Sequence, residues 1–206
     1  GVKQLYAGSD FAFGRGRGGQ IDTINEYGAS VGIAAVSVAL LQDENSVVIS
    51  SSRIRAALQA GDPVAAASML GRDWAVTGTV IKGDQRGRKI GFPTANIALE
   101  TLQHPAFGVY AVEIDIDDGT AAPQKRAGGV ANIGIRPTFE KKDVLCEAHL
   151  FDSDCDLYGQ RLLVRLKAFL RSEQRFSGID ALLAQIATDA EQARRILSDL
   201  HLRQSG

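Results

Sequence analysis

The chain has 206 residues, a formal net charge of −1 and 45% hydrophobic residues, which suits one large or two small folded domains. A charge so close to zero argues against a protein that coats nucleic acid, because such proteins attract phosphates through an excess of basic residues. The longest apolar run, residues 31–41, is about half of the roughly 20 residues that span a bilayer, so no membrane association is expected.

The first part of the chain is expected to alternate short strands and helices. Apolar runs predict strands over residues 2–7, 31–40 and 47–49. The second of these is predicted as a buried strand, although it also fits a helix by pattern alone. Three serines, residues 50–52, are candidate N-caps for a helix over 53–59. A second helix is predicted over 63–70, with Asp62 as its N-cap and Gly71 after its last turn.

After residue 71 the pattern changes to short β-rich segments, and we place a domain boundary between residues 71 and 72. Five segments, several with alternating apolar and polar residues, predict a small antiparallel barrel or sandwich: 74–81, 108–116, 128–135, 146–151 and 162–170. The chain ends in an amphipathic helix that is expected to pack on the barrel. Its apolar face is formed by Ile179, Leu182, Leu183, Ile186, Ala190, Ala193, Ile196, Leu197 and Leu200.

The stretch from Lys82 to Asn96 combines three glycines with four basic residues. Glycines let backbone N–H groups approach an anion closely, and the basic side chains add positive charge where a polyphosphate would lie. Thr94 and Asn96 offer two neutral oxygens, which suits a magnesium ion shared with phosphates. Composition alone favours a plain solvated loop, so phosphate and metal binding is one of two interpretations here.

A carboxylate and an imidazole are expected on one side of a strand, because Glu147 and His149 are two residues apart. Phosphoryl transfer to an alcohol needs a group that accepts the hydroxyl proton, and Glu147 could do so. The alternation equally fits two solvent-facing side chains. Cys146 and Cys155 form no disulfide framework or metal pattern, and they are expected to be reduced thiols in a cytoplasmic protein.

The order of several short motifs resembles the riboflavin kinase family over residues 74–200. They are Gly91–Asn96, Gly108–Tyr110, Asn132–Thr138, Glu147–Leu150, Asp156–Gly159 and Phe169–Arg171. The resemblance implies a mainly β fold, a six-stranded Greek-key barrel with a C-terminal helix. It also implies ATP-dependent phosphorylation of riboflavin to FMN and ADP with Mg²⁺, in a monomer or weak oligomer that binds small molecules.

The resemblance also implies a role for each matching residue. Glu147 would be the catalytic base, and Thr94 and Asn96 would bind magnesium. Arg171 and Phe176 would contact the flavin. The ATP contacts would be Lys82, Gly87, Arg88, Thr94, Asn96, His149 and Tyr158.

Residues 1–71 resemble the latter part of the adenylyltransferase domain of bacterial bifunctional riboflavin kinase/FAD synthetases. The resemblance lies in Gly8–Gly14 and in the segment that contains Ser51, Ser52, Arg53 and Arg55, a vestigial nucleotide site in this interpretation. The family's early His-x-Gly-His box has no counterpart, because no histidine precedes His104. The first recognisable element already resembles the second half of that domain, so we expect a partial α/β segment and no formation of FAD by this chain alone. A flavin-binding module without turnover, or a part of a full FAD synthetase, are the alternative functions.

Overall fold

The computed structural model describes residues 1–83, 87, 91–99, 102–116, 126–137, 142–153 and 156–204, without the side chains of 126, 136, 137, 142, 143 and 204. Its internal contacts separate two compact units, Gly1–Ser50 and Ser51–Gly206. The predicted boundary between residues 71 and 72 falls inside the second unit. That boundary was placed where the sequence pattern changes, and it stays a prediction.

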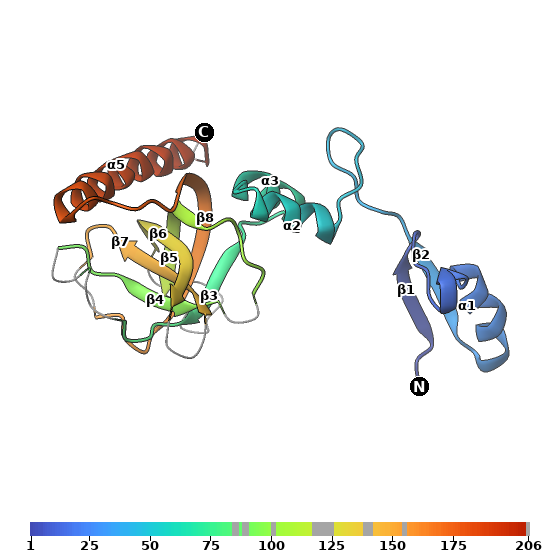
Figure 1. Cartoon of the computed structure of the whole chain (residues 1–206). Coiled ribbons are helices and arrows are strands. Elements are labelled where there is room, and N and C mark those ends of the chain that lie inside the picture. The colour runs from blue at the N-terminus through green and yellow to red at the C-terminus, as the bar shows by residue number, and fades with distance from the viewer. Residues whose placement is uncertain are drawn as a thin grey trace. The chain divides into compact units, whose positions relative to one another are not determined.

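The first unit is a pair of parallel strands with one helix beside it (Figure 1). Strand β1 (Gln4–Gly8) pairs with β2 (Ala34–Val38), and α1 (Ile21–Gly28) packs against β2. Two short 3-10 turns, η1 (Arg15–Arg17) and η2 (Ala29–Val31), flank α1. The first two predicted strands are present, whereas α1 was not predicted. The prediction that the second strand is buried is wrong, because β2 is shorter and mostly exposed. The predicted strand 47–49 is wrong, because this segment forms only a single bridge between Val48 and Gln42 around a turn.

The second unit begins with two helices, α2 (Ser51–Gln59) and α3 (Pro63–Leu70). The predicted capping of α3 is confirmed, because the Asp62 carboxylate accepts from the N–H of Ala65 at 2.9 Å and Gly71 adopts a left-handed φ of 68°. Of the three candidate N-caps for α2, only Ser50 keeps that position, directly before the helix. The helix starts at Ser51, so Ser51 and Ser52 belong to its first turn.

The rest of the second unit is a nearly closed antiparallel barrel. Its strands are β3 (Ala75–Thr79), β4 (Ala95–Ala98), β5 (Gly108–Ile116), β6 (Arg126–Pro137), β7 (Lys142–Leu150) and β8 (Arg161–Ser172). They are hydrogen-bonded in the order β3-β8-β5-β6-β7-β4. Three consecutive strands, β5 to β7, with β8 returning beside β5, form a Greek key. A β-bridge between Ile81, just after β3, and Asn96 on β4 joins the two edges of the sheet. The sheet is therefore a barrel and not a sandwich.

The barrel interior is filled by apolar side chains from all six strands. Val76, Ile97, Tyr110, Ile133 and Leu166 are fully buried there. The Tyr110 hydroxyl donates to the Ala106 carbonyl at 2.6 Å, and burial raises the pKa of this phenol.

A buried thiol in the same interior provides a test of the packing. Cys146 is inaccessible to solvent, and burial raises its pKa to about 12, with a smaller contribution from the neighbouring Glu147 carboxylate. In a Cys155→Ser variant, we therefore expect an aromatic disulfide reagent at pH 8 to modify Cys146 only after denaturation. Rapid modification of the native protein would contradict this packing, and the same reagent in denaturant gives the full thiol count as a control.

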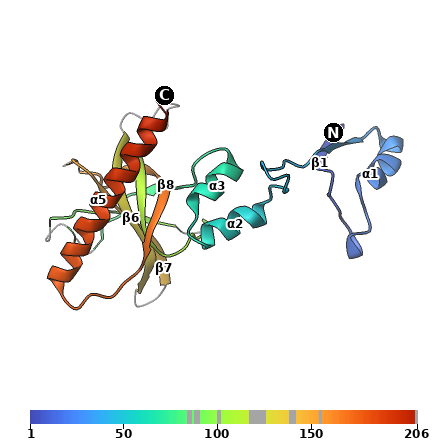
Figure 2. The same cartoon turned by 90° about the horizontal axis from the view of Figure 1, so that it is seen from above.

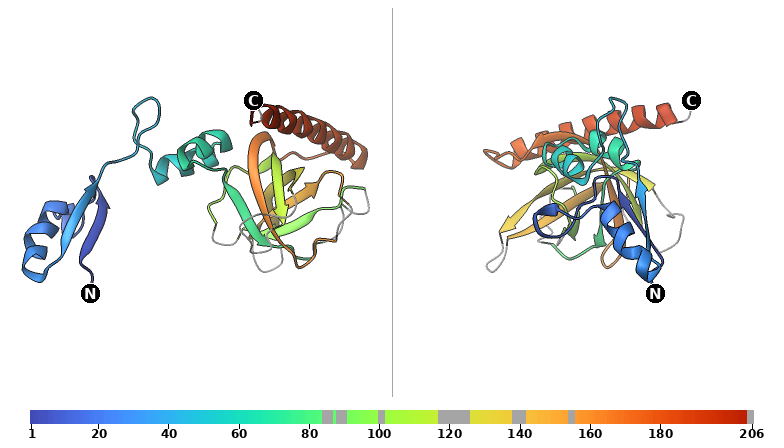
Figure 3. Two further views of the ribbon diagram at one scale, coloured as in Figure 1. Left: turned by 180° about the vertical axis from the view of Figure 1, so that it is seen from behind. Right: turned by 90° about the vertical axis from the view of Figure 1, so that its right-hand side faces the viewer.

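The C-terminal helix α5 (Ile179–Gln204) covers one outer face of the barrel (Figures 1 and 2). Ala193 and Leu197 of α5 pack against Val109, Ala111 and Val130, which point outward from β5 and β6. The predicted packing of this helix is confirmed, except that Ile179 at its start is 56% exposed. The view from behind in Figure 3 shows α5 lying along the outside of the barrel. Among the described helices, none combines the length and apolarity that crossing a membrane requires.

Candidate active site

Five side chains form one row across the outside of the barrel. In the antiparallel register, Asn96 on β4 lies opposite Glu147 on β7, and Glu147 lies opposite Asn132 on β6. Asn132 is in turn opposite Val109 on β5, which is opposite Arg171 on β8. Directly opposed residues project from the same face of a sheet, so these five residues, which we call the outer row, point away from the barrel interior.

Arg171 reaches this face because β8 is irregular. The pairing with β5 shifts between Val109 and Tyr110, so that Leu170 is an extra residue in β8. Phe169 points into the barrel, where its ring meets that of Tyr110 with 5.1 Å between centroids. Strict alternation would place Arg171 on the same side as Phe169, and the bulge moves it to the outer face instead.

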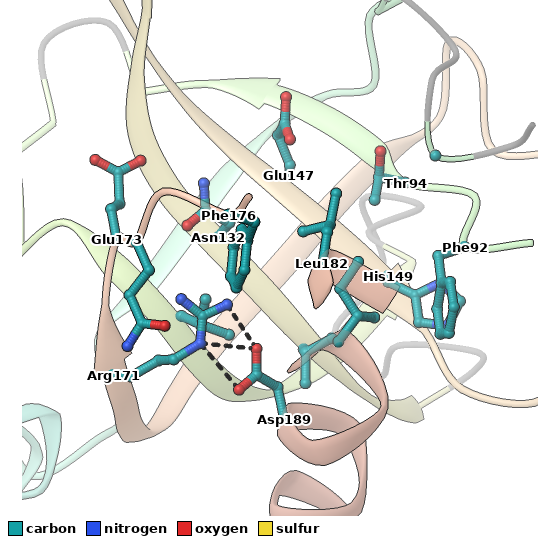
Figure 4. Close-up of a pocket in the computed structure, with 15 residues that line it drawn as sticks. Phe92, Thr94, Asn132, Glu147, His149, Arg171, Glu173, Phe176, Leu182 and Asp189 are labelled. Carbon is teal, nitrogen blue, oxygen red and sulfur yellow. Dashed lines mark hydrogen bonds and ion pairs between the residues drawn. The ribbon is translucent and has the colours of Figure 1, made fainter. Parts of the chain in front are cut away.

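Most of the outer row lines a pocket between the sheet, the segment after β8 and α5. The cavity has a volume of about 380 Å³, within the usual range for a small-molecule site. Figure 4 shows Thr94, His149 and Phe92 at one side of it, and Arg171 and Asp189 at the opposite side. The lining residues are Gly87, Phe92, Thr94, Val109, Val130, Asn132, Glu147, His149, Arg171, Glu173, Gln174, Phe176, Leu182, Ile186 and Asp189.

At one side of the pocket, His149 fixes the segment that carries Thr94. Its Nδ1 lies 2.8 Å from the carbonyl oxygen of Pro93. Because a carbonyl can only accept, Nδ1 carries the proton in this contact. The His149 ring also meets Phe92 edge-on at 5.4 Å. A side chain at Gly87 would collide with the Phe92 carbonyl, so glycine allows the close approach of the two segments.

At the opposite side, Arg171 and Asp189 form a buried ion pair. Nε of Arg171 lies 3.0 Å from both carboxylate oxygens, and Nη2 lies 2.8 Å from Oδ2. Asp189 on α5 is 3% exposed, and it also accepts from Gln185 at 2.9 Å. The Arg171 guanidinium lies 5.7 Å from the ring centre of Phe176.

The residues near Thr94 fit a hard cation. Asn96 lies on the outer face next to Glu147, and its side chain donates to the Thr94 carbonyl at 3.4 Å. A Cβ at Gly83 would lie 2.6 Å from Nδ2 of Asn96. Glycine at this position therefore lets the backbone of residue 83 pack directly against the Asn96 side-chain amide. A hydroxyl, an amide oxygen and a carboxylate are the oxygen donors that Mg²⁺ accepts.

The structure brings together most of the residues that the sequence singled out for the kinase site, but none of those on α2. Gly87, Thr94, Glu147, His149, Arg171 and Phe176 all line the pocket. Asn96 adjoins it through the outer row, whereas Lys82 is exposed beside Gly83, and Tyr158 packs against the barrel core. Arg88 lies outside the described residues. Ser51, Ser52, Arg53 and Arg55 lie on α2 and do not line the pocket.

Several lining residues were not singled out from the sequence. Asn132 belongs to a quoted motif, and only the β6–β7 register shows that it faces Glu147. Asp189 lies on the barrel-facing side of α5, one turn after Ile186 and one turn before the buried Ala193, and the only sequence signal was an acidic residue among apolar positions. Phe92 and Val109 also belong to quoted motifs, and Leu182 and Ile186 to the predicted apolar face of the last helix, but none was given a site role. The lining residues without any sequence signal are Val130, Glu173 and Gln174.

Comparison with known proteins identifies the family. The family model described as riboflavin kinase, Flavokinase, matches residues 70–197. A bifunctional riboflavin kinase/FMN adenylyltransferase of Escherichia coli (strain K12) is 42% identical over 193 residues, which cover 94% of this chain and 60% of the relative. The protein of the same name from Bacillus subtilis (strain 168) is 38% identical over 97% of this chain and 62% of its own length.

A solved structure covers the same part of the chain. The Streptococcus pneumoniae protein described as a macrolide-efflux protein matches with a TM-score of 0.75 and 31% identity, over 93% of this chain and 60% of that one. The chain thus spans about 60% of the length of the curated relatives above. Because the family model covers more than half of its residues, the chain belongs to the riboflavin kinase family.

Proposed function

We propose that this chain transfers the γ-phosphoryl group of ATP to the 5′-hydroxyl of riboflavin and so produces FMN and ADP. One observation carries the proposal: within the family-matched region, a single pocket joins the Glu147 carboxylate to Thr94 on one side and Arg171 on the other. The hydroxyl oxygen would bond to the γ-phosphorus as the bond to the β–γ bridging oxygen breaks. The hydroxyl proton would pass to Glu147, and ADP would leave with the bridging oxygen.

The two sides of the pocket suit the two substrates. Gly87 and Thr94 offer backbone and hydroxyl groups for the ATP phosphates, and His149 holds this segment through Pro93. The opposite side combines Phe176 with apolar side chains of α5, which suits a planar ring. Contacts of ATP with Lys82, Arg88 and Tyr158 remain part of the proposal through the family resemblance.

Magnesium belongs to the same proposal. Thr94 and Asn96 would hold the ion beside Glu147, and the donor set around them fits it. The ion would offset the negative charge of the triphosphate as it approaches the carboxylate.

The test is to incubate the protein with ATP, Mg²⁺ and riboflavin and to separate the flavins by chromatography. We expect FMN in the complete mixture and none above background when excess chelator removes the metal, because the triphosphate charge is then uncompensated. Binding of riboflavin without any FMN would favour the non-catalytic flavin-binding module instead.

We also propose that residues 1–71 are an adenylyltransferase-like segment. The relatives named as bifunctional enzymes align with 94% of the chain, which extends well before the start of the kinase match at residue 70. FAD formation by this chain alone is not expected, and an FAD peak in the same chromatogram would refute that part. A cytoplasmic location and a monomeric or weakly oligomeric state belong to this proposal as well.

A further inference from the structure

We propose that Asp189 is a positioning residue for the flavin, an inference that rests on the proposed function. Asp189 would act through Arg171, by fixing the plane of its guanidinium at the side of the pocket opposite Thr94 (Figure 4). The two residues come from β8 and from the first half of α5, so the pair also ties α5 to the rim of the barrel.

The geometry leaves Arg171 little freedom. The Asp189 carboxylate accepts hydrogen bonds from Nε and Nη2 of Arg171, and Nη1 donates to the Ser172 carbonyl at 3.1 Å. A guanidinium has five N–H groups. Among the described residues, these contacts account for one hydrogen at each nitrogen, so the second hydrogens of Nη1 and Nη2 are left for a ligand in the pocket.

The ion pair also sets the charge at this side of the pocket. Asp189 neutralises Arg171 in a nearly water-free position, where the carboxylate is 3% exposed. A neutralised arginine is a rigid pair of hydrogen-bond donors rather than a free cation. Such a group selects a neutral ligand with carbonyl acceptors at its edge, as in the flavin ring system, over a phosphate.

Asp189 is itself held in place from two directions. Gln185, one turn earlier on α5, donates to Oδ1 at 2.9 Å. One turn after Asp189, Ala193 is fully buried against the outer face of β5 and β6. The carboxylate therefore has a fixed position relative to the sheet. Through the ion pair, it also fixes the position of the Arg171 guanidinium.

The test compares Asp189→Asn with Asp199→Asn, a matched control at an exposed position of the same helix that lines no part of the pocket. Asparagine keeps the shape but removes the charge and one acceptor oxygen. We expect the Kd and KM for riboflavin to rise about tenfold in Asp189→Asn, while kcat and the KM for ATP change by less than about twofold. Riboflavin fluorescence gives the Kd directly.

A double-mutant cycle separates positioning from a general structural effect. In an Arg171→Gln background, Asp189→Asn should change the riboflavin Kd by less than about twofold, because the residue that it positions is absent. Additive losses would overturn the inference. So would a parallel loss of riboflavin binding, ATP binding and melting temperature, or an unchanged riboflavin Kd in Asp189→Asn.

Two further outcomes keep this inference distinct from the proposed function. If the wild type binds riboflavin but forms no FMN, the proposed function fails, and the riboflavin Kd alone decides on Asp189. If the wild type binds no riboflavin, both fail. Should Asp189→Asn not fold, Gln185→Leu removes one donor to Asp189 and is expected to raise the riboflavin Kd about two- to threefold. A Kd unchanged in that variant would count against the inference.

Discussion

Replacing Glu147 by glutamine is expected to lower kcat for riboflavin phosphorylation by about 10²–10⁴-fold, the usual contribution of a general base. Glutamine has nearly the same shape as glutamate but cannot accept the hydroxyl proton. Glu147 lies in the middle of the outer row, between Asn96 and Asn132, so the substitution should leave the pocket and its ligand contacts in place. The riboflavin Kd is therefore expected to stay close to that of the wild type.

The measurement is single-turnover formation of FMN, with the riboflavin Kd determined in parallel by fluorescence. Glu191→Gln is the matched control, because Glu191 is an exposed residue of α5 that pairs with Arg195 and does not line the pocket. A Glu147→Gln enzyme with wild-type turnover would reject Glu147 as the base. A large loss of riboflavin affinity would instead make it a binding residue.

Shortening Ile97 to alanine is expected to have the largest effect on stability. Ile97 is fully buried in the barrel, and a Cβ at Gly78 would lie 2.6 Å from its Cγ2, so it packs directly on β3. Removing a buried isoleucine side chain costs about 2–5 kcal/mol, out of a total stability of about 5–15 kcal/mol. Ile97 also belongs to the four-residue strand β4, whose pairing with β7 is short.

Urea unfolding followed by circular dichroism would measure this loss as a lower midpoint. Ile179→Ala is the control, because that isoleucine is 56% exposed at the start of α5 and should change the midpoint little. A change at Ile97 no larger than that at Ile179 would show that the edge between β3 and β4 is not a packed part of the core.

Sequence reasoning succeeded where the signal is local. The cap at Asp62 and the left-handed Gly71 bound α3 as predicted, since each acts within one turn of helix. The alternation of Glu147 and His149 also predicted a shared face correctly, because β7 pairs with β6 without a shift around these residues. Strand β4 is different: its four residues are too few for a periodic pattern, and only pairing with β7 makes them a strand.

Arg171 and Asp189 show why the rest of the site could not be predicted by pattern. Alternation along β8 would turn Arg171 toward the barrel interior, and the bulge at Leu170 that reverses it depends on pairing with β5. Asp189 lies at helical spacing from Ile186 and Ala193, which indicates a buried carboxylate, but its partner is decided only when α5 docks. The packing of Ala193 and Leu197 on the sheet places the Asp189 carboxylate within reach of Arg171.

The outer row exists only in the assembled sheet. Its members come from five strands, and their order across the sheet, Asn96, Glu147, Asn132, Val109 and Arg171, differs from their order along the chain. No continuous segment shorter than the stretch from Asn96 to Arg171 contains the whole row. A proteolytic cut or a split point anywhere in that stretch would divide the row between two pieces, so FMN formation would report their reassembly.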